Sequence, residues 1–231
     1  MRKKVLCLAF RDTIPVMTGY VFLGIGFGIL MKQNGYGFWW SAAMGLFIYA
    51  GSMQYLAVGL LSGGASVVTA ALTTLMVNAR HLFYGISMVD AYRDTEKWKP
   101  YLIFGLTDET YSLVTQPTPF QGKERHRYCF LVTLLDHLYW ISGCALGSLA
   151  GSLLPVDFTG ISFVLTALFV TIFTEQWLTS KDHGPACIGV GATAVCLLLF
   201  GRDLFLIPSM AAIAGLLILK RKSGRGDGCD G

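Results

Sequence analysis

Long apolar runs, separated by short clusters of charged residues, constrain this chain more than any other feature of its sequence. A bilayer core of about 30 Å needs about 20 apolar residues in each crossing helix. Most of the runs approach this length and are apolar on every face, so the sequence predicts an all-α transmembrane bundle with six to eight crossings. The runs cover approximately residues 13–31, 38–60, 65–89, 101–115, 128–153, 158–179, 185–200 and 204–219.

The composition excludes several other classes of protein. Only 14% of the residues are charged, whereas a soluble domain has about 25%. The net charge of +4 comes largely from the tails and one loop, which fits membrane orientation better than nucleic-acid binding. The sequence contains no HExxH, GxSxG or P-loop motif and no CxxC pair, so we expect no enzyme, no cofactor and no metal site. Any pumping must then use an ion gradient, a partner or the gradient of the solute itself.

Basic clusters predict the orientation. Because loops rich in lysine and arginine stay in the cytoplasm, we expect a cytoplasmic amino tail at 1–12, a permease domain at 13–219 and a cytoplasmic basic tail at 220–231. The cluster at 123–127 is placed on the same side. With eight crossings, all three basic clusters lie on the cytoplasmic side. This count puts the loop 90–99 outside, although that loop also contains Arg93, Lys97 and Lys99.

Small residues suggest close helix packing and an internal repeat. Gly24-xxx-Gly28 lies in the first run and Gly147-xxx-Gly151 in the fifth, and such spacings let membrane helices approach closely. Transporters are often built from two structural repeats that hold the solute between them. If the run 101–115 spans the membrane, the two halves are parallel, and if it only dips in, they are inverted. Chance similarity between two glycine-rich segments is an equally good explanation.

Polar residues in the second run form the first candidate site. Ala50-Gly51-Ser52 lets the helix thin or unwind, which would free backbone groups to face a ligand, and Gln54 adds a neutral donor and acceptor. The alternative is a close helix crossing in which Gln54 bonds to a neighbouring helix.

The third run contains Asn78, Arg80, His81 and Tyr84. An arginine deep in a membrane helix needs a partner or a water-filled cavity, because each charge there costs about 3 kcal/mol or more. Positions 80, 81 and 84 share one helical face, so we expect these side chains to point at one cavity, where the Arg80 guanidinium can bind a carboxylate. The alternative places Arg80 at the interface, with its head group reaching water.

Acidic residues complete the set. Asp108 and Glu109 lie in a short apolar run, which suggests an unwound or re-entrant segment beside a polar cavity. They could neutralise Arg80 in a structural salt bridge, hold a substrate ammonium group or carry a proton. Further titratable groups that could couple transport to protons or another ion are His81, Asp136, His137 and Glu175.

Three segments resemble one known family. They are GLFIYAGSMQYLAVGLL (45–61), LTTLMVNARHLFYGIS (72–87) and YLIFGLTDETYSLV (101–114), and in this order they resemble the AzlC family of branched-chain amino acid transport proteins. The remainder matches only in hydrophobic layout and in the carboxylates near 136 and 175. The resemblance implies an inner-membrane permease that exports branched-chain amino acids together with a small AzlD-like membrane subunit.

These observations combine into one hypothesis with two alternatives. The expected permease binds the substrate carboxylate with Arg80 and the backbone near Gly51 and Ser52, and the ammonium group with Asp108 or Glu109. A channel-like pore, or a transporter for another small zwitterion, is the first alternative. A scaffold or an intramembrane enzyme, in which Asp108 and Asp136 imitate an aspartyl pair, is the second.

Overall fold

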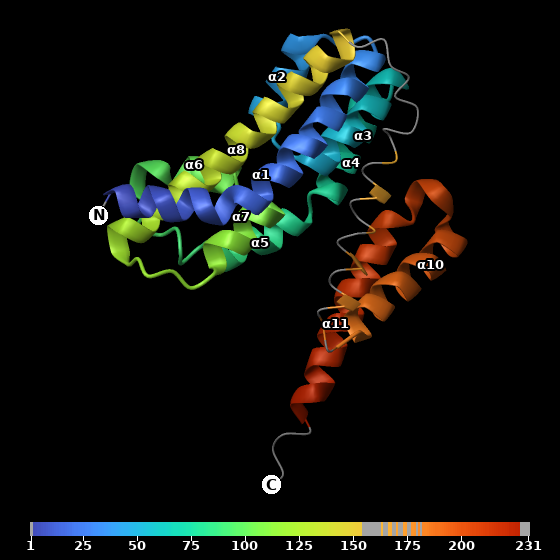
Figure 1. The fold of residues 1–231 in the computed structure, drawn as a ribbon. Helices are drawn as coiled ribbons and strands as arrows, with labels where there is room; N and C mark the ends of the chain where they lie inside the picture. The colour runs from blue at the N-terminus through green and yellow to red at the C-terminus, as the bar shows by residue number, and fades with distance from the viewer. Residues whose placement is uncertain are drawn as a thin grey trace. The chain divides into compact units, whose positions relative to one another are not determined.

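The computed structural model describes residues 2–153, 163, 166–167, 170, 173–174, 177–178, 180 and 182–226. The chain divides into two compact units, Met1–Thr166 and Ala167–Gly231, each described here by itself (Figure 1). Every regular element in these described residues is a helix, which confirms the all-α prediction. Three of the described helices are long and apolar enough to cross a membrane: Lys3–Gln33, Gly122–Leu153 and Gly184–Gly201. The count of six to eight crossings stays a prediction.

Two long helices, α1 (Arg2–Gln33) and α8 (Gly122–Leu153), lie side by side in the first unit (Figure 1). A Cβ atom at Gly24 would come within 2.9 Å of the backbone of Gly143, and one at Gly28 would collide with the backbone near Gly147. Residue numbers therefore increase together along the interface, so the helices are parallel. The two predicted glycine motifs thus face one another, and their close approach supplies the packing that holds membrane helices together.

The second apolar run forms a hairpin of two helices rather than one crossing. Helix α2 (Phe38–Phe47) ends before Tyr49, whose φ is +43°, and α3 begins at Gly51 and ends at Ser62. Helix α2 starts just after the end of α1, and Ser62 at the end of α3 donates a hydrogen bond of 2.8 Å to Asn34 Oδ1. The run therefore enters and leaves at the same end of the unit.

The third run crosses the unit as two helices. Helix α4 (Val67–Val77) starts near the Asn34 end, where Ser66 caps it by accepting a 3.1 Å hydrogen bond from the Thr69 backbone N–H. After a break at 78–79, α5 (Arg80–Met88) continues toward the opposite end. There Met88 packs in a buried cluster with Val5 and Tyr128, which belong to the beginnings of α1 and α8.

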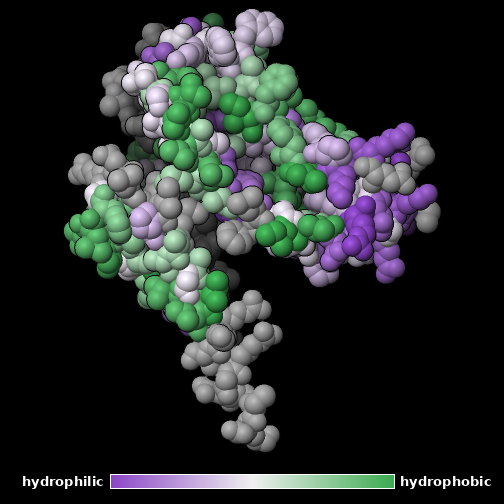
Figure 2. Space-filling view, turned by 180° about the vertical axis from the view of Figure 1, so that it is seen from behind, coloured by the Kyte–Doolittle hydropathy of each residue, from purple (hydrophilic) through white to green (hydrophobic). Residues whose placement is uncertain are grey.

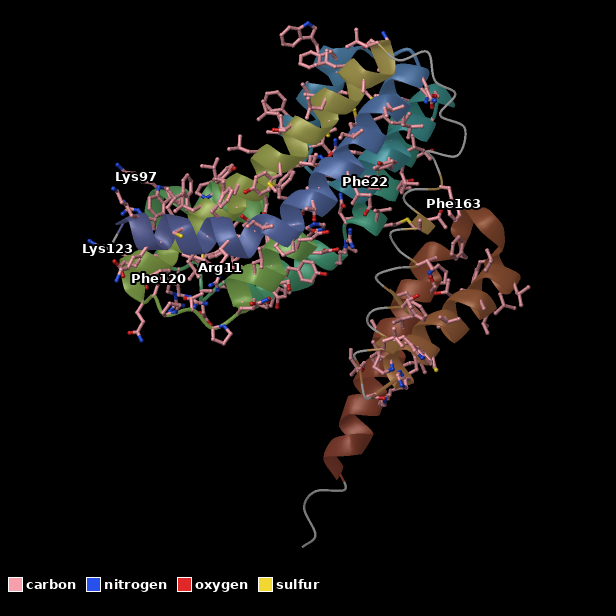
Figure 3. All side chains as sticks on the ribbon, viewed as in Figure 1. Arg11, Phe22, Lys97, Phe120, Lys123 and Phe163 are labelled. Atoms are coloured by element: carbon pink, nitrogen blue, oxygen red, sulfur yellow. The ribbon has the colours of Figure 1, made fainter. Side chains whose placement is uncertain are left out.

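The fourth run forms a second hairpin, which enters from the end opposite to the first. A short 3₁₀ helix (Glu96–Trp98) leads into α6 (Lys99–Phe104), and the chain turns at 105–107 into α7 (Asp108–Thr115). A surface pocket of about 480 Å³ is lined by residues from both flanking loops, including Asp94 and Lys97 with Lys123. Figure 3 shows Lys97 and Lys123 at one end of the unit.

This arrangement corrects the predicted position of the loop 90–99. The loop lies on the same side as 123–127, not on the opposite side, because the intervening run is too short and too interrupted to cross. Helices α1 and α8 are parallel, and the relation of the two halves as repeats stays a prediction.

The predicted amino tail is part of the folded unit. Helix α1 begins at Arg2, Val5 and Ala9 are buried, and Tyr128 donates a 2.9 Å hydrogen bond to Asp12 Oδ2. The division into an amino tail, a permease domain and a basic tail stays a prediction. The hydrophilic surface of this end stands out from the apolar remainder in Figure 2.

The second unit contains α10 (Gly184–Leu204) and α11 (Leu206–Gly226). Lys220 on α11 forms a salt bridge with Asp182, with Nζ 2.7 Å from Oδ2. This contact ties the segment before α10 to the middle of α11. Helix α11 extends to Gly226, so it includes part of the predicted tail 220–231.

Candidate functional site

Three half-helices of the first unit begin close to one another. Helices α3, α5 and α7 start at Gly51, Arg80 and Asp108. The Arg80 guanidinium forms an ion pair with Asp108, and its Nη2 donates a 3.0 Å hydrogen bond to Ser52 Oγ. The first N–H groups of a helix lack intrahelical partners and carry a positive partial charge. The arrangement therefore places an ion pair among three helix starts.

The Arg80–Asp108 pair lies at the inner tips of the hairpins rather than at an end of the unit. The side chains of Arg80 and Asp108 are 35% and 33% exposed, so water or a solute can reach both. Arg80 Nε is buried and has no partner. A charge in a membrane needs a partner or a wet cavity, and Asp108 is the partner of Arg80 at this position.

Gln54 supports the break between α2 and α3. Its side chain is fully buried, and Oε1 accepts hydrogen bonds from Trp140 Nε1 at 2.8 Å and from the Ala50 N–H at 3.2 Å. Gly51 packs against the same indole, since a Cβ atom there would lie 3.0 Å from Trp140 Cη2. The α3 start is thus fixed against α8, while Gln54 Nε2 is left without a partner.

The neighbouring acids Asp108 and Glu109 have different partners. Glu109 Oε2 accepts a 2.7 Å hydrogen bond from the Tyr20 hydroxyl of α1. Asp136 on α8 is fully buried and accepts a 2.8 Å hydrogen bond from Thr110. Asp108 thus pairs with Arg80, whereas Glu109, which is also partly exposed, bonds to α1 and the buried Asp136 bonds to α7.

His137 is held against the break in the first hairpin. Its Nδ1 lies 3.0 Å from the Tyr101 hydroxyl and its Nε2 lies 3.3 Å from the Gly45 carbonyl oxygen. The ring of Tyr49 lies 4.3 Å away, centroid to centroid. His137 therefore joins the ends of α2 and α6 to α8.

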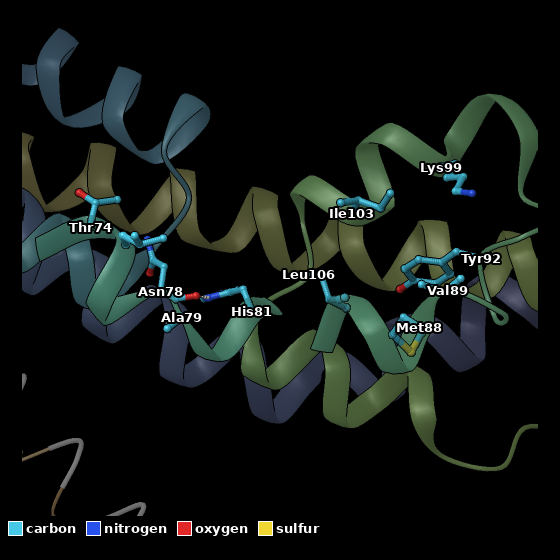
Figure 4. A pocket seen from close by; sticks show the side chains of 12 residues that line it. Thr74, Asn78, Ala79, His81, Met88, Val89, Tyr92, Lys99, Ile103 and Leu106 are labelled. Atoms are coloured by element: carbon cyan, nitrogen blue, oxygen red, sulfur yellow. Dashed lines mark hydrogen bonds between the residues drawn. The ribbon is translucent and has the colours of Figure 1, made fainter. Parts of the chain in front are cut away.

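The predicted common face of α5 is divided between two places. A cavity of about 430 Å³ is lined by Asn78 and His81 (Figure 4). Arg80 and Tyr84 instead face α7, where Tyr84 stacks on Tyr111 at a centroid distance of 4.6 Å. The rings of His81 and Tyr84 nevertheless lie 5.9 Å apart, centroid to centroid, and the expectation that positions 80, 81 and 84 point at one cavity stays a prediction. Glu175 lies outside the described residues.

Sequence reasoning missed the hydroxyl groups that join the acids. Tyr20 lies 2.6 Å from Thr107 Oγ1, and Thr107 caps α7 by accepting a 3.3 Å hydrogen bond from the Thr110 N–H. The pattern Thr107-Asp-Glu-Thr110 is a helix-start signal that could have revealed the cap. The sequence gives no signal for the Tyr20 contact, which depends on how α1 packs.

Broken helices with charged and polar tips, packed against two continuous helices, are the architecture in which membrane transporters bind solutes. The described residues contain no group of three side chains that could hold a metal ion. The fold and the site therefore define a membrane transport protein. The chain belongs to the AzlC family: the family model "AzlC protein" matches residues 15–154, which include the tips of both hairpins. This is a family of transport proteins and not of enzymes.

Curated relatives agree with this assignment. The branched-chain amino acid transport protein AzlC of Bacillus subtilis is 46% identical over 214 residues, which cover 93% of this chain and 84% of that protein. An uncharacterized membrane protein of Helicobacter pylori is 41% identical, with 93% and 94% coverage. The inner membrane protein YgaZ of Escherichia coli is 27% identical, with 90% and 84% coverage. No solved structure matches the chain.

Proposed function

We propose that this chain is a permease that exports branched-chain amino acids across the cytoplasmic membrane, driven by an ion gradient. The observation that carries the proposal is the contact of Arg80 with Asp108 and Ser52 where three half-helices begin. A free amino acid carries a carboxylate and an ammonium group on adjacent carbons. The site offers the Arg80 guanidinium for the carboxylate and the Asp108 carboxylate for the ammonium group, and these two side chains are in contact.

The substrate can insert into the ion pair without changing its total charge. Its carboxylate takes the place of Asp108 beside Arg80, and its ammonium group takes the place of Arg80 beside Asp108. The start of α3 adds the Ser52 hydroxyl and free backbone N–H groups, which favour an anion. Because both the empty and the loaded site are neutral overall, neither state leaves an unpaired charge in the membrane.

The apolar side chain of the substrate fits the cavity beside α5. This cavity reaches Asn78 and Ala79, directly before Arg80, and its wall includes Met88 and Leu106. Its volume of about 430 Å³ leaves room for a leucine side chain. Apolar lining with few polar groups is the usual way in which a pocket selects apolar ligands.

The proposed orientation rests on the charge difference between the two ends of the first unit. Lysines and arginines gather at the end with the start of α1 and the loops 90–99 and 121–127, whereas the other end, formed by 32–37 and 62–66, has Lys32 as its one charged residue. The positive-inside rule puts the basic end in the cytoplasm. We propose the same side for the carboxyl terminus and, from the family resemblance, a small AzlD-like membrane partner.

Efflux of leucine from cells loaded with leucine dipeptides tests the proposal. The cells should express the small partner, and the variants to compare are Arg80→Gln and Asp108→Asn. A matched control is the exposed pair Arg93 and Asp90, whose side chains approach to 3.8 Å outside the site. We expect the site variants to lose most of the efflux, while Arg93→Gln and Asp90→Asn retain it. Normal efflux in both site variants, at normal protein levels in the membrane, contradicts the proposal.

A further inference from the structure

A continuous chain of oxygen atoms joins two carboxyl groups across the first unit. From α7, Glu109 Oε2 lies 2.7 Å from the Tyr20 hydroxyl, which lies 2.6 Å from Thr107 Oγ1. Thr107 Oγ1 lies 3.1 Å from Thr110 Oγ1, and Thr110 Oγ1 lies 2.8 Å from Asp136 Oδ2 on α8. Three of these distances lie in the usual range for O–H···O hydrogen bonds of about 2.5–3.0 Å, and the Thr107–Thr110 contact is slightly longer.

The number of protons in this chain decides the charge of its ends. Four hydrogen bonds need four hydrogens, whereas Tyr20, Thr107 and Thr110 each supply one. If both carboxyl groups were ionised, one pair of oxygens would lie in contact with no hydrogen between them. A protonated carboxyl group at one end would supply the fourth hydrogen. Thr107 also accepts the Thr110 N–H at 3.3 Å, which leaves its single hydroxyl hydrogen free for the chain.

We propose that Glu109 and Asp136 share one proton, which moves between them through the hydroxyl groups of Tyr20, Thr107 and Thr110. When Glu109 is protonated, it donates to Tyr20, and each following hydroxyl donates toward the Asp136 carboxylate. When each oxygen passes its hydrogen to the next, Glu109 becomes the carboxylate and Asp136 becomes the acid. No proton is gained or lost in this step, and the reverse step restores the first state.

The shared proton is placed to respond to the substrate, a step that rests on the proposed function. Glu109 is next to Asp108, which receives the ammonium group in that proposal. A positive group there stabilises a negative charge on Glu109, so substrate binding moves the proton toward Asp136. This movement gives a physical link between solute binding and a proton gradient.

Other titratable groups near the two carboxyl groups belong to several elements. Asp136 is next to His137 on α8. The other groups that interact electrostatically with one or both carboxyl groups are Tyr20, Tyr49, Tyr84, Tyr101 and Tyr128, with the Arg80–Asp108 pair beside Glu109. Among these named residues, Arg80 carries a positive charge, and it is already paired with Asp108.

Infrared spectroscopy of the purified protein tests the shared proton without any transport assay. The wild type should show one carboxylic-acid C=O band that shifts in D₂O. In Glu109→Gln or Asp136→Asn, the new amide supplies the fourth hydrogen, so either single substitution should remove the whole band. Thr133→Val is a matched control, because Thr133 donates only to the Cys129 carbonyl oxygen of its own helix. A band that each amide variant reduces only in part overturns the proposal.

Proteoliposomes test whether the relay couples transport. Tyr20→Phe should retain leucine–leucine exchange and lose at least about tenfold in leucine accumulation driven by a proton gradient. Tyr55→Phe is the control, because Tyr55 is buried but donates to the Leu23 carbonyl oxygen. Retained proton-driven accumulation in Tyr20→Phe overturns the coupling. Absence of leucine exchange in the wild type would instead refute the proposed function, and the infrared result would still decide the shared proton.

Discussion

The two hairpins of the first unit both consist of two short helices, but their tips differ in charge. The α2–α3 hairpin contains no charged residue between Phe38 and Ser62, and its tip presents a helix start with Gly51 and Ser52. The α6–α7 hairpin enters from the basic end, and its tip presents Asp108 and Glu109. In the proposed function, one tip binds the carboxylate of the substrate and the other binds its ammonium group. The proposal thus gives both tips, which meet at Arg80, a part in binding one zwitterion.

The continuous helices make this division possible. Helices α1 and α8 pack backbone to backbone through Gly24, Gly28, Gly143 and Gly147. The half-helices around them are short and interrupted, and in the proposed function these short helices contact the solute. The following predictions test this difference between the two tips.

Removal of the charge at the acidic tip should have the largest effect. Asp108→Asn should lower kcat/KM for leucine about 100-fold, because contacts to a charged group contribute up to about 3 kcal/mol and each 1.4 kcal/mol is tenfold. The variant also leaves Arg80 unpaired. The double variant Arg80→Gln/Asp108→Asn should therefore recover the folded yield lost in the single variant, without recovering transport. Recovered transport would show that the pair is only structural.

Removal of the hydroxyl group at the neutral tip should have a moderate effect. Ser52→Ala deletes one hydrogen bond to Arg80 and should raise KM for leucine about fivefold, as expected for a loss of about 1 kcal/mol. Ser62→Ala, at the far end of the same hairpin, is the matched control and should leave KM unchanged. Equal KM values for the two variants would remove the neutral tip from the binding site.

The smallest effect is expected from one methyl group at the start of α3. Gly51→Ala puts a Cβ atom 3.0 Å from the Trp140 ring and should lower the free energy of unfolding by about 1 kcal/mol. Gly59→Ala meets no atom within 4 Å and should raise it, because alanine favours helices by up to about 1 kcal/mol over glycine. Thermal unfolding in detergent measures both. The same sign for the two changes would contradict the tight α3–α8 packing.

The sequence predicted two of the helix breaks beside the candidate site but little of the geometry of that site. Helix-breaking residues before Gln54 and the acids at 108–109 predicted where two runs are interrupted, and both interruptions are present. The break at 78–79 was missed, because a single Asn lowers helix propensity by less than about 1 kcal/mol and gives only a weak signal. The side of the loop 90–99 was also wrong. The basic residues of this loop pointed to the cytoplasm. The predicted count of eight crossings put it outside, because apolar runs alone cannot distinguish a helix that spans the membrane from a hairpin that turns back.

Contacts between distant helices were beyond any pattern in the sequence. Apolar runs show that α1 and α8 lie in a membrane, but their register depends on which glycines meet. The contacts of Tyr20 with Thr107 and Glu109 follow from that register. For the same reason, the sequence grouped Arg80 with His81, whereas the break turns their side chains toward different neighbours.

Side-specific labelling of single cysteines tests the central claim that the two hairpins enter from opposite faces. Single cysteines at Ala65, Asp94 and Gln121, all exposed, should be introduced into a variant without the native cysteines. With an impermeant maleimide added to intact cells, we predict that position 65 reacts, whereas 94 and 121 react only after the cells are opened. Labelling of 94 and 121 from opposite sides would show that the acidic hairpin crosses the membrane, which would contradict this account.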